Sequence, residues 1–383
     1  MRAQAVAENQ PVPGEQNRMT TELSKFAARL RGLIRHADFP ASAFEAQALE
    51  LFTLQFQHNA TYRRICEARR VSPRAVTGWQ QIPAVPAAAF KELELTALPP
   101  AERTHVFHSS GTTGQRPSRH FHSTASLALY EASLLGWFRR HRGRARRLLA
   151  LAPPAAQVPH SSLVHMFETI RRHEAQAESV FVGRLARDGG WEVDGEAAVR
   201  ILREVCASPE PLLILGTAFS FVHLLDVLAD GNQYWKLPAG SAALETGGYK
   251  GRSRNLPKAE LYEMISERLG LGSAQIICEY GMSELSSQAY DLSLARDGNP
   301  LHSASVIRRF QFPPWARVQV ISPETGDEVA DGETGLLRIY DLANVFSVLA
   351  IQTEDLAIRR GEGFELIGRA QLAEPRGCSL MAV

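Results

Sequence analysis

Apolar runs and helical segments alternate through the middle of the chain, and this alternation restricts the fold more than any other feature of the sequence. Four apolar runs and two segments with helical spacing follow one another: residues 147–152, 211–216, 219–228, 241–245, 258–269 and 274–279. Strand and helix thus repeat in steps of ~30 residues. The pattern predicts an α/β fold in which a largely parallel sheet is flanked by helices.

The spacing of apolar residues at the two ends of the chain differs from that in the middle. Apolar residues recur at helical spacing from Thr21 to Arg70, whereas short alternating segments separated by turns begin after Pro314. The alternating segments predict a small antiparallel β lobe. We expect a flexible tail over residues 1–20, an α/β core over 21–315, the antiparallel lobe over 316–369 and a C-terminal tail over 370–383.

Composition excludes several classes of protein. The formal net charge of the 383 residues is +1, which leaves no electrostatic footprint for nucleic acid. No apolar stretch reaches membrane-spanning length, and the N-terminal segment lacks the apolar region of a signal peptide. The four cysteines form neither a disulfide nor a zinc pattern, so we expect a cytoplasmic protein. Cys66, Cys206 and Cys278 have apolar sequence neighbours, which predicts that they pack in the core.

The strongest local signal for chemistry is the segment from His108 to Gln115. It reads His-Ser-Ser-Gly-Thr-Thr-Gly-Gln and is rich in hydroxyl and backbone N–H donors, which suit a triphosphate. No Gly-Lys-Ser/Thr follows, so it is not a Walker A loop. Taken alone, the segment is equally typical of an ordinary polar turn.

Carboxylates follow at positions where an α/β fold binds ligands. Glu284 ends the segment Tyr280-Gly281-Met282-Ser283-Glu284, just after the predicted strand 274–279. Ligands bind at the carboxyl ends of parallel strands, so Glu284 is placed to hold a divalent metal. Further on, Asp355 offers a carboxylate that accepts from two ribose hydroxyls, and Arg369 offers a guanidinium.

Four segments thus follow one another along the chain: residues 108–115, 280–284, 353–356 and 367–369. In this order they resemble the core motifs of the adenylate-forming superfamily, which includes acyl-CoA synthetases, peptide-synthetase adenylation domains and firefly-type luciferases. The resemblance implies the superfamily's N-terminal core fold and ATP- and Mg²⁺-dependent activation of a small-molecule carboxylic acid as an acyl-adenylate, with release of pyrophosphate. It implies that the β- and γ-phosphates lie on Ser109, Ser110, Gly111, Thr112, Thr113 and Gly114. It implies that the adenine lies on Gly247, Gly248, Tyr249, Tyr280 and Gly281. The remaining roles that it implies are the α-phosphate for Ser283, Mg²⁺ for Glu284, the ribose for Asp355 and the hinge for Arg369.

The chain departs from the superfamily pattern in two respects, and both indicate one particular family within the superfamily. Where the superfamily's loop continues with Pro-Lys, this chain has Gln115-Arg116, so Arg116 or Arg119 is a candidate source of positive charge. We also expect the superfamily's mobile C-terminal domain, with its catalytic lysine, to be missing, since no lysine follows Lys258. In these respects the chain is similar to the acyl-protein synthetases of bacterial luminescence operons. That resemblance implies self-acylation at Cys378 and transfer of the acyl group to a partner protein.

Two alternatives stay open at this point. In the first, the thiol acceptor is coenzyme A or a carrier-protein phosphopantetheine rather than Cys378. In the second, the chain is a non-catalytic nucleotide-binding scaffold subunit. The histidine pairs His105/His108 and His120/His122 have a spacing that permits metal binding, but no Cys or carboxylate lies beside them as a further ligand. The sequence names neither the acid nor the oligomeric state.

Overall fold

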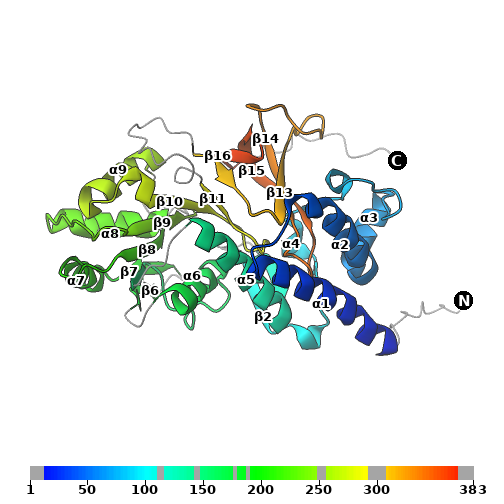
Figure 1. Ribbon diagram of the computed structural model, residues 1–383, viewed down its shortest axis with the longest axis horizontal. Coiled ribbons are helices and arrows are strands. Elements are labelled where there is room, and N and C mark those ends of the chain that lie inside the picture. Colours follow the sequence, from blue (N-terminus) through cyan, green and yellow to red (C-terminus); the bar gives the residue numbers. More distant parts are fainter. Residues whose placement is uncertain are drawn as a thin grey trace, which may run out of the picture.

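The computed structural model describes residues 13–109, 116–141, 147–175, 179–186, 190–247, 256–291 and 308–369. Within this part of the chain, twelve strands form one mixed sheet (Figure 1). The order across the sheet is β13 (Ala316–Ile321), β14 (Thr334–Asp341), β15 (Ala350–Arg360), β16 (Gly363–Arg369), β12 (Phe310–Gln311), β11 (Ala289–Asp291), β10 (Ile276–Tyr280), β9 (Ala242–Thr246), β8 (Leu212–Thr217), β4 (Arg147–Ala150) and β5 (Val180–Phe181). The twelfth strand, β1 (Val85–Pro86), pairs with β15.

Along this strand order the pairing changes once, from parallel to antiparallel. From β10 through β9, β8 and β4 to β5 every pairing is parallel. From β10 through β11, β12 and β16 to β15, β14 and β13 every pairing is antiparallel. The predicted antiparallel strands therefore continue the parallel part of the sheet, and β10 is the strand where the two parts meet.

Helices cover both faces of the parallel part. On one face lie α5 (Thr124–His141) and α6 (Ser162–Glu174), and on the other lie α7 (Gly195–Cys206), α8 (Ala218–Asp230) and α9 (Lys258–Leu269). Successive residues of β8 alternate between the two cores: Leu213 packs on the α5 side and Ile214 on the α8 side. Strands buried on both faces read as continuous apolar runs, which is why the sequence pattern predicts them.

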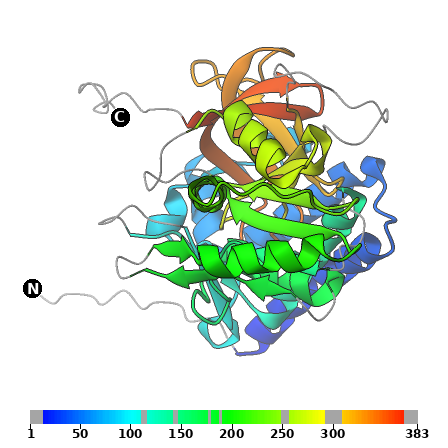
Figure 2. The same cartoon turned by 90° about the vertical axis from the view of Figure 1, so that its left-hand side faces the viewer.

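The N-terminal helices lie at the other end of the molecule from α7–α9 (Figure 1). Figure 2 looks onto the α7–α9 end, with its green and yellow-green helices toward the viewer. The N-terminal helices are α1 (Pro13–Arg35), α2 (Phe44–His58), α3 (Ala60–Ala68) and the short α4 (Ala89–Glu92). The remaining elements are the hairpins β2 (His105–His108) with β3 (Arg119–His122) and β6 (Gly183–Leu185) with β7 (Trp191–Val193), and the 3₁₀ turns Ala41–Ala43, Trp79–Gln81, Pro100–Glu102 and Ser273–Gln275.

Local signals fix several helix ends. The side chains of Ser161, Asp194 and Thr217 accept backbone N–H bonds at the starts of α6, α7 and α8. Gly270 ends α9 in the left-handed conformation, with φ 66°, which glycine adopts without strain. Since Thr217 ends β8 and also caps α8, the chain turns from strand to helix within one residue.

The α/β prediction is confirmed: the predicted apolar runs form β4, β8, β9 and β10, with ends shifted by one or two residues. Among the described residues, none of the helices combines the length and apolar character that a membrane span requires.

Candidate active site

The hairpin of β2 and β3 holds the base of the predicted phosphate loop. Its strands pair from His105 with His122 to His108 with Arg119. Beyond them, Ser109 N donates to Ser118 Oγ at 3.2 Å, and Ser118 N donates to Ser109 Oγ at 3.0 Å. This reciprocal pair closes the hairpin just below the loop. Ser110, Gly111, Thr112, Thr113 and Gly114 lie outside the described residues.

The hairpin is bonded to the segment that follows β10. Ser118 Oγ lies 3.2 Å from Ser283 Oγ, and His120 Nδ1 lies 2.9 Å from the Ser283 carbonyl oxygen. Because a carbonyl only accepts, Nδ1 carries the hydrogen. Burial lowers the pKa of His120 to about 4, so the imidazole is neutral at neutral pH. The structure thus brings the base of the predicted phosphate loop, at Ser118, next to the predicted Ser283-Glu284 pair.

Glu284 is a buried carboxylate with few protein partners. It is 5% exposed, and its Oε2 accepts from Ser283 Oγ at 3.0 Å. Among the described residues, no basic side chain lies within ion-pair distance of it. Next to it, Asn344 Nδ2 donates to the Glu284 carbonyl oxygen at 2.9 Å, and Asn344 Oδ1 is a buried acceptor without a partner. A buried carboxylate that has no basic partner among the described residues fits the oxygen donor set of Mg²⁺.

Tyr280, Asp355 and Arg369 form a second cluster at the same edge of the sheet. Tyr280 OH donates to Asp355 Oδ2 at 2.7 Å, and Arg369 Nε lies 3.6 Å from Asp355 Oδ1. Asp355 and Arg369 are register partners on β15 and β16, which explains why residues distant in sequence meet. Burial and the Asp355 carboxylate raise the pKa of Tyr280, so it stays a hydroxyl donor. Each Asp355 oxygen keeps a lone pair for a ligand hydroxyl.

The end of β9 lies beside β10. Gly247 has φ 69°, a left-handed conformation that explains glycine there, and Gly248 and Tyr249 lie outside the described residues. Thr246 hydrogen-bonds through its hydroxyl to Glu279, its register partner. The predicted adenine segment therefore begins next to the strand that leads into Tyr280.

Glu279 is a site residue that the sequence analysis missed. It is 5% exposed, and burial raises the pKa of its carboxyl to about 7. Its Oε1 occupies the space that a Cβ at Gly281 would fill, so a larger residue at position 281 would displace the Glu279 carboxylate. A charged residue at the end of an apolar strand, directly before Tyr280, was the available signal.

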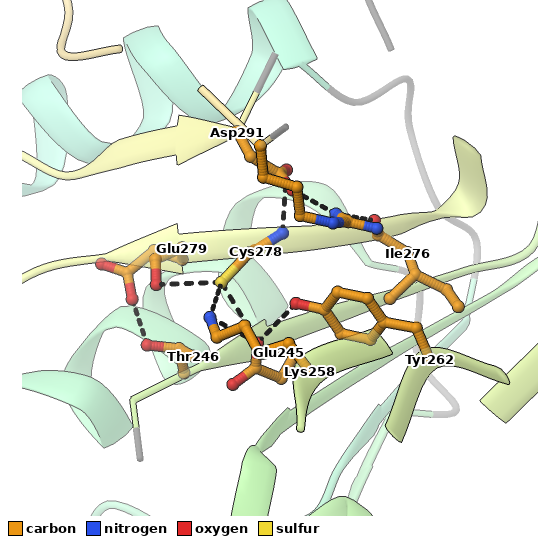
Figure 3. Close-up of polar contacts among 9 residues, drawn as sticks. Glu245, Thr246, Lys258, Tyr262, Ile276, Cys278, Glu279 and Asp291 are labelled. Carbon is orange, nitrogen blue, oxygen red and sulfur yellow. Dashed lines mark hydrogen bonds and ion pairs between the residues drawn. The ribbon is translucent and has the colours of Figure 1, made fainter. Parts of the chain in front are cut away.

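The other face of the same strands holds a buried network of ionisable groups (Figure 3). Cys278 Sγ lies 2.7 Å from Lys258 Nζ and 3.1 Å from Glu245 Oε2. Tyr262 OH donates to the same Glu245 oxygen at 2.8 Å, and Lys258 Nζ lies 3.3 Å from it. Cys278 is buried in the core, as predicted, but its thiol also contacts charged side chains. Its cross-strand neighbour Glu245 and a lysine of α9 surround the thiol, and neither is adjacent in sequence.

A second carboxylate completes this network. Asp291 Oδ1 accepts from Cys278 N at 2.9 Å, and Arg308 donates to Asp291 Oδ2. Lys258 and Arg308 thus place two cations against the buried carboxylates. The network lies under the strand that carries Glu279 and Tyr280, and it ties α9 to that strand.

The remaining candidate residues have structural partners or lie outside the described residues. The Arg116 guanidinium lies 3.4 Å from Glu92 and that of Arg119 lies 3.4 Å from Glu94. The histidines do not form a metal site: the described residues contain no group of three or more His, Cys, Asp or Glu side chains arranged to hold an ion. Cys66 is buried and Cys206 is partly exposed, whereas Cys378 lies outside the described residues.

Comparison with known proteins identifies the family. Residues 192–382 match the family model "Acyl-protein synthetase, LuxE". The chain belongs to the LuxE family of acyl-protein synthetases. Two long-chain-fatty-acid–luciferin-component ligases are similar to most of this chain. The one from Aliivibrio fischeri is 23% identical over 354 residues and matches 86% of this chain and 85% of its own. The one from Vibrio harveyi is 21% identical over 344 residues, covering 86% and 84%.

Solved structures place this LuxE-family chain in the adenylate-forming fold. A 2-hydroxyisobutyryl-CoA ligase in an open conformation, in complex with 2-HIB-AMP and CoA, matches with a TM-score of 0.58 and 15% identity, covering 85% of this chain and 73% of its own. The same ligase in the postadenylation state matches with a TM-score of 0.58 and 14% identity, covering 96% and 73%. The expected superfamily and fold are confirmed, and with the family the ligase class is established.

Proposed function

We propose that this LuxE-family ligase activates a long-chain fatty acid as its acyl-adenylate, with ATP and Mg²⁺, and passes the acyl group through Cys378 to a partner protein. The names of the Aliivibrio and Vibrio relatives support a fatty acid as the substrate. The observation that carries the proposal is the hydrogen-bonded chain from Ser118 through Ser283 to Glu284, since it joins the predicted phosphate loop to the buried carboxylate.

In the first half-reaction, a carboxylate oxygen of the fatty acid attacks the α-phosphorus of ATP, and the bond to the pyrophosphate oxygen breaks. The protein has to hold two anions together and neutralise the charge that develops on the leaving group. The N–H and hydroxyl groups of the predicted loop would donate to the phosphates, and Ser283 Oγ would do so by turning its hydrogen away from Glu284. Glu284 would hold Mg²⁺, which supplies charge neutralisation when bound.

The ribose would be held by Asp355. Tyr280 orients this carboxylate through a hydrogen bond to one oxygen, and the exposed Arg369 guanidinium lies 3.6 Å from the other. The lone pairs that remain accept from two vicinal hydroxyls. Because these neighbours already restrict the Asp355 carboxylate, nucleotide binding removes less conformational freedom from this side chain.

In the second half-reaction, the thiolate of Cys378 attacks the acyl carbonyl carbon, and AMP leaves with the electron pair of the C–O bond. A thiolate, rather than a thiol, is the nucleophile, and the nearby Arg376 favours it. The resulting thioester then exchanges with a nucleophile of the acceptor protein. A reducing cytoplasm would keep this thiol free.

The test combines pyrophosphate release with intact-protein mass. The wild type, Cys378→Ser and the control Cys206→Ser are incubated with ATP, Mg²⁺ and acids of several classes, namely fatty acids of increasing chain length, aryl acids and amino acids. We expect release with long-chain fatty acids for all three proteins. An acyl-sized mass gain is expected in the wild type and in Cys206→Ser, and not in Cys378→Ser.

Other outcomes contradict parts of the proposal. A covalent acyl group on Cys378→Ser would exclude Cys378 as the acceptor. Release that depends on added coenzyme A or a carrier protein, without mass gain, would move the acceptor to that thiol. ATP binding without release for any acid would indicate a scaffold subunit.

A further inference from the structure

The segment 341–349, from the last residue of β14 to the start of β15, is held by a side-chain amide of an N-terminal helix. Gln55 of α2 is fully buried. Its Nε2 donates to the carbonyl oxygens of Asn344 at 2.8 Å and Val345 at 3.2 Å, and its Oε1 accepts from Leu349 N at 2.9 Å. One side chain thus satisfies three backbone groups of a segment that has no regular pairing there.

A second amide acts on the same segment. Asn59, also fully buried, donates through Nδ2 to the Ser347 carbonyl oxygen at 3.1 Å, while its Oδ1 caps α3 by accepting from Tyr62 N at 3.0 Å. Ser347 Oγ in turn donates to the Leu95 carbonyl oxygen at 2.9 Å. The segment is therefore fixed to α2, α3 and the chain near α4 at once.

The far side of the same segment contacts the site. Asn344 Nδ2 donates to the Glu284 carbonyl oxygen at 2.9 Å. The buried carboxylate of Asp341 accepts from Ser286 N at 2.9 Å and from Ser287 Oγ at 2.7 Å. Two tethers thus join the segment 341–349 to the turn that carries Glu284.

A buried amide costs free energy where a donor or acceptor stays unpaired, as Asn344 Oδ1 does, and its paired groups favour one geometry. Gln55 uses both ends of its amide, and the bonds run in series from α2 to the backbone of Glu284. The polar chain crosses the core without a gap in the described residues. Such an arrangement transmits the position of α2 to Glu284.

We propose that Gln55 and Asn344 are positioning residues that hold the backbone of Glu284, so that its carboxylate faces the metal–nucleotide site. The N-terminal helices α2 and α3, which lie outside the part of the chain matched by the family model, thereby contribute to the active site. The metal part of this inference rests on the proposed role of Glu284.

The first test is independent of activity. Hydrogen exchange of the backbone amides of residues 283–287 is compared in the wild type, Gln55→Met, Asn344→Ala and the control Thr53→Val. Thr53 lies on the same helix, and within the part of the chain that the structure describes its hydroxyl bonds to the Leu49 carbonyl oxygen of that helix alone. We expect at least about tenfold faster exchange at 283–287 in Gln55→Met and Asn344→Ala, and unchanged exchange in Thr53→Val.

The second test measures metal affinity. Binding of Mn²⁺ in the presence of α,β-methylene-ATP is followed by electron paramagnetic resonance, and the Mg²⁺ dependence of pyrophosphate release is recorded in parallel. Gln55→Met and Asn344→Ala should weaken Mn²⁺ binding and raise the Mg²⁺ concentration for half-maximal rate by about threefold to tenfold. Saturating Mg²⁺ should restore most of kcat. A merely structural role would lower Tm and leave the metal affinity unchanged.

The variant Glu284→Gln distinguishes the positioning role of Gln55 and Asn344 from the metal-binding role of Glu284. If it abolishes Mn²⁺ binding while Gln55→Met and Asn344→Ala bind normally, the positioning role is wrong and the metal role of Glu284 stands. If Glu284→Gln binds Mn²⁺ as the wild type does, the metal role is wrong, and the exchange rates at 283–287 still test the tether. If Gln55→Met fails to fold, Asn344→Ala carries both measurements.

Discussion

Replacing Glu279 by Gln should change how stability depends on pH. Burial raises the pKa of this carboxyl from its ordinary value of 4.5 to about 7, the Thr246 hydroxyl partly opposes the rise, and the charge of Glu245 adds to it. Between these two pH values the folded protein binds more protons than the unfolded chain. The free energy of unfolding therefore falls as pH rises from 4.5 to 7. A shift of this size corresponds to about 3 kcal/mol.

Urea unfolding of the wild type and of Glu279→Gln at several pH values from 5 to 8 measures this effect. The amide does not titrate and keeps an acceptor for Thr246, so the variant should gain stability relative to the wild type by about 2–3 kcal/mol between pH 5 and pH 8. Taking the difference between the two proteins cancels other titrating groups, such as Asp341, whose pKa burial raises to about 6. A difference that stays constant over this range would refute the reasoning.

Two further substitutions test the neighbouring contacts. Tyr280→Phe removes the 2.7 Å hydrogen bond to Asp355 and should weaken ATP binding by about tenfold, with a smaller effect on kcat. The KM for ATP in pyrophosphate release measures this change. An unchanged KM would exclude the role of Asp355 in holding the ribose. Lys258→Met leaves the Glu245 carboxylate and the Cys278 thiol without their cation and should lower the free energy of unfolding by about 2 kcal/mol in urea, less than for a fully buried pair because 45% of the Lys258 side chain is exposed. Equal stability would show that solvent screens this network completely.

The parallel strands were predictable because a strand buried on both faces is apolar at successive positions of the sequence. Runs such as Leu212–Leu215 are apolar at every position, and the turns that follow them are marked by capping residues such as Thr217. The order of the chemical segments along the chain was equally local. These features identify the fold and several predicted site residues without any knowledge of long-range contacts.

Other features depend on pairings between distant parts of the chain. Cys278 has apolar neighbours in sequence, yet its environment is set by Glu245 across the sheet and by Lys258 on a helix. The tether from Gln55 to Asn344 joins residues 289 positions apart. Neither pairing leaves a periodic pattern in the sequence. Glu279 was missed for a related reason, since its raised pKa follows from the depth at which β10 is buried.

The central claim is that the carboxylate of the acid attacks the α-phosphorus of ATP and is activated as the acyl-adenylate. Its most direct test uses a long-chain fatty acid whose carboxylate oxygens carry a heavy isotope, with wild-type protein, ATP and Mg²⁺, followed by mass spectrometry of the nucleotide and phosphate products. We predict one heavy oxygen in the phosphate of AMP and none in pyrophosphate, because the carboxylate oxygen stays with AMP when a thiol takes the acyl group. Heavy oxygen in inorganic phosphate, or AMP without label, would contradict acyl-adenylate formation.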